Sequence, residues 1–224
     1  MRILAFDCAV TGATAAVLVD GRTAGAARAD GPRGQAERLI PVIEAALAQA
    51  GLDYGDLDRL AVTVGPGSFT GIRVGLAAAR GLVLATGLDC VPVTTFDAIA
   101  HAVPATLRAG RHVWVAIDSR RGDLFVQAFG ADLAPIGPSR VATVAEVAAD
   151  VANRPGDAVL AGDGASLLAA SPGLGGVPVA PSSVPDAEVV ARIAAGRSAA
   201  AVPPSPLYLR PPDVTLPPLP RPPG

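Results

Sequence analysis

The sequence contains no lysine, because all 18 of its basic residues are arginine. This absence excludes a P-loop, which needs a lysine directly after its last glycine. Aromatic residues make up only 4% of a chain that is 50% hydrophobic, so we expect closely packed layers of small side chains. The formal net charge is −2, whereas nucleic-acid binding usually requires a basic patch. Strong direct binding of RNA by this chain alone is therefore not expected.

Cysteine and histidine are equally scarce, with two residues of each. Cys8 and Cys90 are expected to be free thiols in the cytoplasm, because Met1 leads directly into an apolar strand without a signal peptide. No histidine lies near Cys8 in the sequence, which argues against a nucleophilic cysteine. His101 and His112 fall on different predicted elements, without the spacing of metal ligands. We therefore predict no metal site and no catalytic residue.

Two segments of the chain share one design, in which an apolar strand is followed by an aspartate, a short loop and a returning strand. The first segment spans residues 3–19 and contains Asp7, and the second spans residues 112–129 and contains Asp118. We predict an α/β fold of the two-lobed actin-like ATPase or sugar-kinase type, in which the second lobe is reduced. The predicted units are a first lobe over 1–104, a second lobe over 105–210 and a flexible proline-rich tail over 211–224.

The loops of the two hairpins leave alternatives open. In the actin-like fold the first loop faces the nucleotide phosphates, and Asp7 would help to hold a metal or a water; alternatively, Asp7 only caps its turn. In the second loop Arg120 and Arg121 stand where such a kinase has glycine, serine or threonine. A partner contact or a solvated turn explains these arginines at least as well as a phosphate contact. The candidate nucleotide contacts, vestigial or at an interface, are Asp7, Thr11, Gly67, Ser68 and Asp118.

Residues 65–81, with the sequence GPGSFTGIRVGLAAARG, are the most informative stretch. They follow an apolar strand and lead into a helix predicted over 70–86. Such a corner is a ready anion site, although a tight turn without a ligand explains it equally well. Gly71, Gly75 and Ala79 form a stripe of small residues, which would let a helix of the same chain or of another chain approach closely. We expect the helix to be too short and too interrupted by charge to span a membrane.

A second long helix is predicted over residues 35–50. Leu39 and Ile43 belong to its apolar stripe. Pro41 falls inside this stretch, so we expect the regular helix to begin near the proline or to kink there.

Five motifs, in this order, resemble the TsaB family. They are residues 3–7 (ILAFD), 37–41 (ERLIP), 65–73 (GPGSFTGIR) with Gly75 and Gly81, 116–120 (AIDSR) with Gly122, and 208–210 (YLR). The resemblance spans the chain up to about residue 210, and GPGSFTGxR is its most specific part.

The resemblance implies a bacterial cytosolic protein of the actin-like fold that supports threonylcarbamoyladenosine formation in tRNAs decoding ANN codons. It implies a non-catalytic partner of the related TsaD, which transfers the threonylcarbamoyl group to the adenosine next to the anticodon. The ATPase TsaE would join the pair, and tRNA would be reached only through the complex. No nucleotide is expected to bind tightly to this chain, although ATP or ADP fits the complex.

The resemblance also implies that helices of the first lobe form the dimer contact, here residues 35–50 and 70–86. The expected interface residues are Leu39, Ile43, Gly71, Arg73, Gly75, Ala79 and Arg80. The same helices would serve a homodimer, so the sequence does not rank homodimer against heterodimer. The alternative function is a small-molecule or carboxylate kinase that acts alone, with Asp7 and Asp118 around Mg-ATP.

Overall fold

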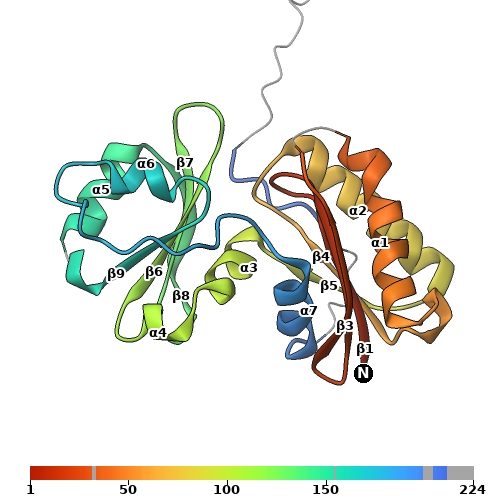
Figure 1. The fold of residues 1–224 in the computed structure, drawn as a ribbon. Coiled ribbons are helices and arrows are strands. Elements are labelled where there is room, and N and C mark those ends of the chain that lie inside the picture. Colours follow the sequence, from red (N-terminus) through yellow and green to blue (C-terminus); the bar gives the residue numbers. More distant parts are fainter. Residues whose placement is uncertain (32–33, 154, 199–203, 211–224) are drawn as a thin grey trace, which may run out of the picture.

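The computed structural model describes residues 1–31, 34–153, 155–198 and 204–210, and it contains two mixed β-sheets (Figure 1). The predicted tail over 211–224 lies outside the described residues. The strands of the first sheet are β1 (Arg2–Asp7), β2 (Ala13–Val19), β3 (Arg22–Ala29), β4 (Arg59–Thr63) and β5 (Cys90–Val93). Those of the second are β6 (His112–Asp118), β7 (Leu124–Phe129), β8 (Pro135–Ala142) and β9 (Ala158–Ala161).

The two sheets repeat one topology. The first has the strand order β3-β2-β1-β4-β5 and the second has the order β8-β7-β6-β9. In both, the first strand of the lobe pairs antiparallel with its hairpin partner and parallel with a strand that returns after a helix. The predicted α/β class, with an actin-like duplication and a reduced second lobe, is therefore confirmed.

Seven α-helices and two short 3-10 helices cover the sheets in the described part of the chain. The α-helices are α1 (Gln35–Ala50), α2 (Phe69–Thr86), α3 (Thr95–Ala102), α4 (Ala105–Arg108), α5 (Val144–Ala152), α6 (Ala165–Ala169) and α7 (Ala187–Ala195). The 3-10 helices are η1 (Tyr54–Asp56) and η2 (Pro155–Asp157).

Helices α1 and α2 cover one face of the first sheet, and α7 covers the other (Figure 1). The bounds of α1 are those predicted, and the helix runs through Pro41, whose ring lies on the exposed side. It ends at Gly51, where a φ of 65° suits glycine. Helix α2 begins after Ser68, whose hydroxyl accepts a hydrogen bond from the amide of Gly71 at 3.2 Å.

Helix α3 lies between the two sheets and belongs to both cores (Figure 1). Ala98 packs in the cluster that α7 forms with the first sheet. Phe96 and Ile99 pack in a cluster with β6 and β7 of the second sheet. Because one helix contributes to both cores, the lobes are joined by buried apolar contacts in addition to the connecting chain.

The division of the chain into lobes needs one correction. The second lobe was predicted to run over 105–210, but α7 packs on β1 and β2 of the first sheet. The sequence pattern of α7 predicts a helix with one apolar face and does not specify which sheet that face will cover. The boundary near residue 104 stays a prediction.

Candidate functional site

The small-residue stripe of α2 faces the chain's own first loop. A Cβ atom at Gly71 would lie 1.9 Å from the carbonyl oxygen of Cys8, and one at Gly75 would contact the Cys8 sulfur at 3.4 Å. Ala79 is fully buried. The expectation that this stripe receives a helix of another chain is therefore corrected, because the stripe lets α2 approach the β1–β2 loop and β4.

Leu39 and Ile43 of α1 are also buried in the core beneath α1 and α2. An apolar stripe at helical spacing marks the side of α1 that covers the sheet, and the prediction assigned that side to a partner. Of the seven predicted interface residues, only Arg73 and Arg80 lie at the surface.

The outer side of α2 is the exposed apolar surface that the sequence reasoning did not single out. Phe69 is 53% exposed and Leu84 is 88% exposed. Between them, at spacings of three or four residues, lie Arg73, Ala77, Arg80 and Gly81, all exposed. We call these six residues the α2 face. The lack of charge over residues 81–86 was the signal in the sequence that could have revealed it.

Helix α2 is by length and composition apolar enough to cross a membrane, with a mean hydropathy of 1.3 over its 18 residues. The prediction that it is too short and too charged for this is therefore wrong on those two criteria. One side of the helix packs on β4 in a folded lobe, as a soluble core helix would. Of its 18 residues, 28% are buried. The partly buried side chains of Val74, Ala78, Leu82 and Val83 also pack against the core of the first lobe.

Residues 204–210, which we call the strap, cross from the first lobe to the second. The amide of Leu207 donates to the carbonyl of Val64 at 2.8 Å, and the Leu207 side chain packs against the first core. Leu209 packs against the core beneath the second sheet. Arg210 forms an ion pair with Asp123, just before β7. The strap thus contacts both lobes within a few residues.

The strap also holds both arginines of the α2 face. The Arg73 Nε donates to the hydroxyl of Tyr208 at 3.1 Å, and its guanidinium lies 3.4 Å from the centre of the Phe69 ring. The Phe69 and Tyr208 rings are stacked, with centroids 6.0 Å apart. The Arg80 Nη2 donates to the carbonyl of Pro204 at 3.0 Å. These contacts order one end of the α2 face before any partner binds.

Three of the predicted nucleotide contacts surround Ala9 in the first loop. The Asp7 carboxylate accepts from the Ala9 amide at 3.0 Å and also from the Thr63 hydroxyl. The Ser68 amide donates to the Ala9 carbonyl at 2.5 Å, and a Cβ at Gly67 would lie 2.1 Å from that oxygen. In an anion site the Ser68 amide would donate to the ligand. Here it donates to the Ala9 carbonyl of the same lobe instead.

The Asp7 carboxyl is buried, and burial raises its pKa to about 6 against the opposing effect of the Thr63 and Ala9 hydrogen bonds. Thr11, by contrast, is exposed on the same loop. Cys8 is buried beside Asp7, and burial raises the pKa of its thiol to about 12. A thiol in that state is a poor nucleophile, which agrees with the prediction for Cys8.

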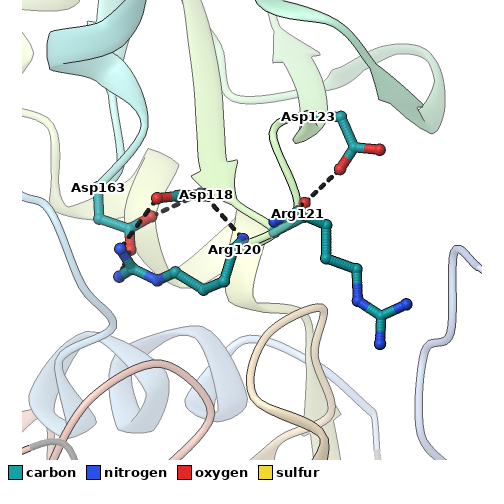
Figure 2. A network of polar contacts seen from close by, with 6 residues as sticks. Asp118, Arg120, Arg121, Asp123 and Asp163 are labelled. Atoms are coloured by element: carbon teal, nitrogen blue, oxygen red, sulfur yellow. Dashed lines mark hydrogen bonds and ion pairs between the residues drawn. The ribbon is translucent and has the colours of Figure 1, made fainter.

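Asp118, the remaining predicted nucleotide contact, is paired inside the second lobe. Figure 2 shows the Arg120 side chain reaching between Asp118 and Asp163. Its Nη1 lies 2.9 Å from the Asp118 carboxylate and its Nη2 lies 2.8 Å from the Asp163 carboxylate. The amide of Asp118 donates to Asp163 at 2.9 Å. Arg120 adopts a φ of 62°, which is uncommon for a residue other than glycine. The charged arginine thus occupies the loop that the actin-like interpretation of the sequence assigned to phosphate binding.

Burial raises the pKa of Asp163, while the Asp118 amide and the charge of Arg120 lower it. The guanidinium of Arg120 therefore neutralises part of the negative charge of Asp118 and Asp163. Among the described residues, no group of three or more histidine, cysteine or acidic side chains is placed to hold a metal ion.

Comparisons with known proteins give consistent matches. The family model described as "TsaD: tRNA N6-adenosine threonylcarbamoyltransferase" matches residues 31–172. The tRNA threonylcarbamoyladenosine biosynthesis protein TsaB of Escherichia coli is 37% identical over 125 residues, covering 56% of this chain and 53% of the relative. An uncharacterized protein of Mycobacterium tuberculosis is 36% identical over 183 residues, covering 81% of this chain and 77% of the relative. The match thus spans about half the length of the E. coli relative.

Two solved structures from Pseudomonas aeruginosa share the fold over nearly the whole chain. One, described as a protein with similarity to peptidase YeaZ, has a TM-score of 0.78 at 25% identity, covering 93% of this chain and 99% of that one. The other, YeaZ, has a TM-score of 0.77 at 24% identity with the same coverage.

Proposed function

The chain belongs to the TsaB (YeaZ) family, within the group described by the TsaD family model, and from this premise we propose that it is a non-catalytic partner of TsaD. In this role it binds and activates TsaD for the transfer of a threonylcarbamoyl group to tRNA adenosine. TsaE joins the complex, and tRNA is bound only through the complex. The working location is the cytoplasm.

The α2 face is the observation that carries the proposal. A side chain as apolar as Leu84 and 88% exposed contributes nothing to the stability of the free chain, but it contributes free energy when a partner removes it from water. Ala77 and Gly81 next to it have no bulky side chain, so a partner helix can approach closely. The aromatic and arginine cluster of Phe69, Arg73 and Tyr208 at one end is of the composition that dominates binding energy at protein interfaces.

A related fold in the partner explains why TsaD is favoured. The TsaD family model covers most of this chain, so TsaD is expected to present a helix pair equivalent to α1 and α2. Two equivalent faces can pair about a two-fold or pseudo-two-fold axis. A homodimer uses the same face, and it is the competing state of the free chain.

The second-lobe loop supports a non-catalytic role. Asp118 and Asp163 would need to be available to a hydrated metal ion in a nucleotide site, but Arg120 pairs with both. No tight binding of ATP or ADP by the chain alone is proposed; a nucleotide in the complex depends on groups from the partner.

Size-exclusion chromatography with light scattering tests the proposal. The purified chain is compared alone and mixed with TsaD from the same organism, with and without ATP, and calorimetry measures ATP binding to the chain alone. A heterodimer or larger complex, together with no saturable ATP binding by the chain, is the expected result. Absence of a complex, with ATP turnover by the chain that Asp7→Ala abolishes without unfolding, would favour the kinase alternative instead.

A further inference from the structure

Helices α3 and α7 lie side by side between the sheets (Figure 1). A pocket of about 370 Å³ opens beside them. It lies apart from the α2 face, which belongs to the opposite side of the first sheet. The residues that line it are His101, Val189, Arg192, Ile193, Gly196 and Arg197. We call it the α3–α7 pocket.

The lining has an apolar floor and a basic rim. Val189 and Ile193 are buried, whereas His101 and Arg192 are exposed and Arg197 is half-buried. The six lining residues include no acidic side chain. A chain with a formal net charge of −2 therefore concentrates two arginines and a histidine around one hollow.

Neighbouring groups hold the arginines in place. Arg197 Nη2 binds the Asp97 carboxylate at 3.0 Å, which orients the guanidinium without exhausting its five donors. Arg59 donates to the carbonyls of Ala194 and Arg197, at 3.0 and 2.7 Å. The carbonyl end of α7 would otherwise repel an anion, and Arg59 offsets that partial negative charge.

The pKa of His101 also reflects an excess of positive charge around the pocket. Partial burial lowers the pKa of the imidazole, and the positive charges of Arg197 and Arg108 lower it further, while Asp97 on the same helix raises it. Arg192 lines the pocket from α7. The surroundings of His101 therefore disfavour protonation of its imidazole. A bound anion would favour protonation and so raise the pKa of His101.

We propose that the α3–α7 pocket binds a small anion with a phosphate group, which Arg192, Arg197 and His101 contact as donors. The volume lies within the range of small-ligand sites, about 300–1,000 Å³. The apolar floor suits the organic part of a phosphomonoester. RNA is disfavoured, because one pocket on an acidic chain lacks the basic stripe that tracks a nucleic-acid backbone. This inference does not depend on the proposed function.

Histidine NMR provides a direct test, because His101 and His112 are the chain's only histidines. Inorganic phosphate and phenyl phosphate are titrated at constant ionic strength while the Cε1–H signals are followed. The His101 signal is expected to shift saturably and its titration midpoint to rise, with tighter binding of phenyl phosphate. The His112 signal, from β6 outside the pocket lining, should stay in place.

Variants distinguish specific phosphate binding in the α3–α7 pocket from a general effect of positive charge on the chain. Arg192→Gln should weaken phenyl phosphate binding by about tenfold or more, with partial recovery in Arg192→Lys. Arg22→Gln, which removes an exposed arginine outside the lining, should leave binding unchanged. Equal shifts of both histidines, no saturation, or equal affinity of Arg192→Gln and wild type would overturn the proposal. A short single-stranded RNA that moves the His101 signal when both phosphates fail would also overturn it and assign the pocket to RNA.

Discussion

The Cα of Gly71 lies so close to Cys8 that an added Cβ would be 1.9 Å from the Cys8 carbonyl oxygen. The thiol of Cys8 in turn donates to the Gly71 carbonyl at 3.1 Å. The start of α2 is thereby attached to the first loop. The stripe of small residues packs inside the first lobe.

Gly71→Ala should destabilise the chain, because the Cβ would collide with the backbone of Cys8, which would have to shift. We expect the free energy of unfolding to fall by about 1–3 kcal/mol or more, measured by urea denaturation. Gly75→Ala is the matched control. Its Cβ would meet neighbours at 3.4 and 3.5 Å, an ordinary contact, and alanine favours the helix. Equal losses for the two variants would contradict the assignment of the stripe to the lobe's own core.

Asp7 should make stability fall as the pH rises. Its pKa is about 6 in the folded chain against an ordinary value of 3.8 for an aspartate, so the folded state binds the proton more tightly. The contribution is therefore complete below about pH 3.8 and is lost as the pH rises through about 6, with a size of about 3 kcal/mol.

Asp7→Asn tests this linkage, because asparagine keeps an oxygen for Thr63 and the Ala9 amide without a charge. The variant should exceed the wild type in free energy of unfolding at pH 8, and the difference should shrink towards pH 4. Asp89→Asn, at an exposed position, controls for the loss of one charge. A difference between Asp7→Asn and wild type that does not change with pH would rule out the proposed titration.

Arg120 combines two ion pairs with a backbone conformation that costs free energy. Substitution by alanine removes the two ion pairs but keeps the backbone strain at φ 62°. Substitution by glycine removes the ion pairs and also the strain. Arg120→Gly should therefore be more stable than Arg120→Ala by about 1 kcal/mol in urea denaturation. If the alanine variant equals or exceeds the glycine variant, the loop conformation described for Arg120 is not the one in solution.

The repeated hairpin design around Asp7 and Asp118 was sufficient to predict two sheets that begin with the same hairpin, because apolar strands and aspartate turns depend on local sequence. The bounds of α1 followed from its apolar stripe for the same reason. The sheet that α7 covers depends on the path of the intervening chain, which periodicity does not specify.

The side of α2 that faces a partner could not be predicted from the sequence. Gly71 and Leu84 lie on opposite sides of α2, and both belong to apolar or small-residue patterns. Sequence periodicity separates the two sides but does not say which one meets the chain's own β-sheet. The ion pairs of Arg120 also depend on Asp163, which is 43 residues away in sequence.

The affinity of the chain for TsaD, measured for Leu84→Glu against Leu167→Glu, tests the central claim most directly. Both leucines are exposed, at 88% and 47%, but Leu84 lies on the α2 face and Leu167 lies on α6 of the second lobe. A charge buried at a helix interface without a partner is strongly unfavourable. We predict that Leu84→Glu lowers the affinity by about thirtyfold or more while Leu167→Glu binds as the wild type does. Unchanged affinity in Leu84→Glu would contradict the assignment of TsaD to this face.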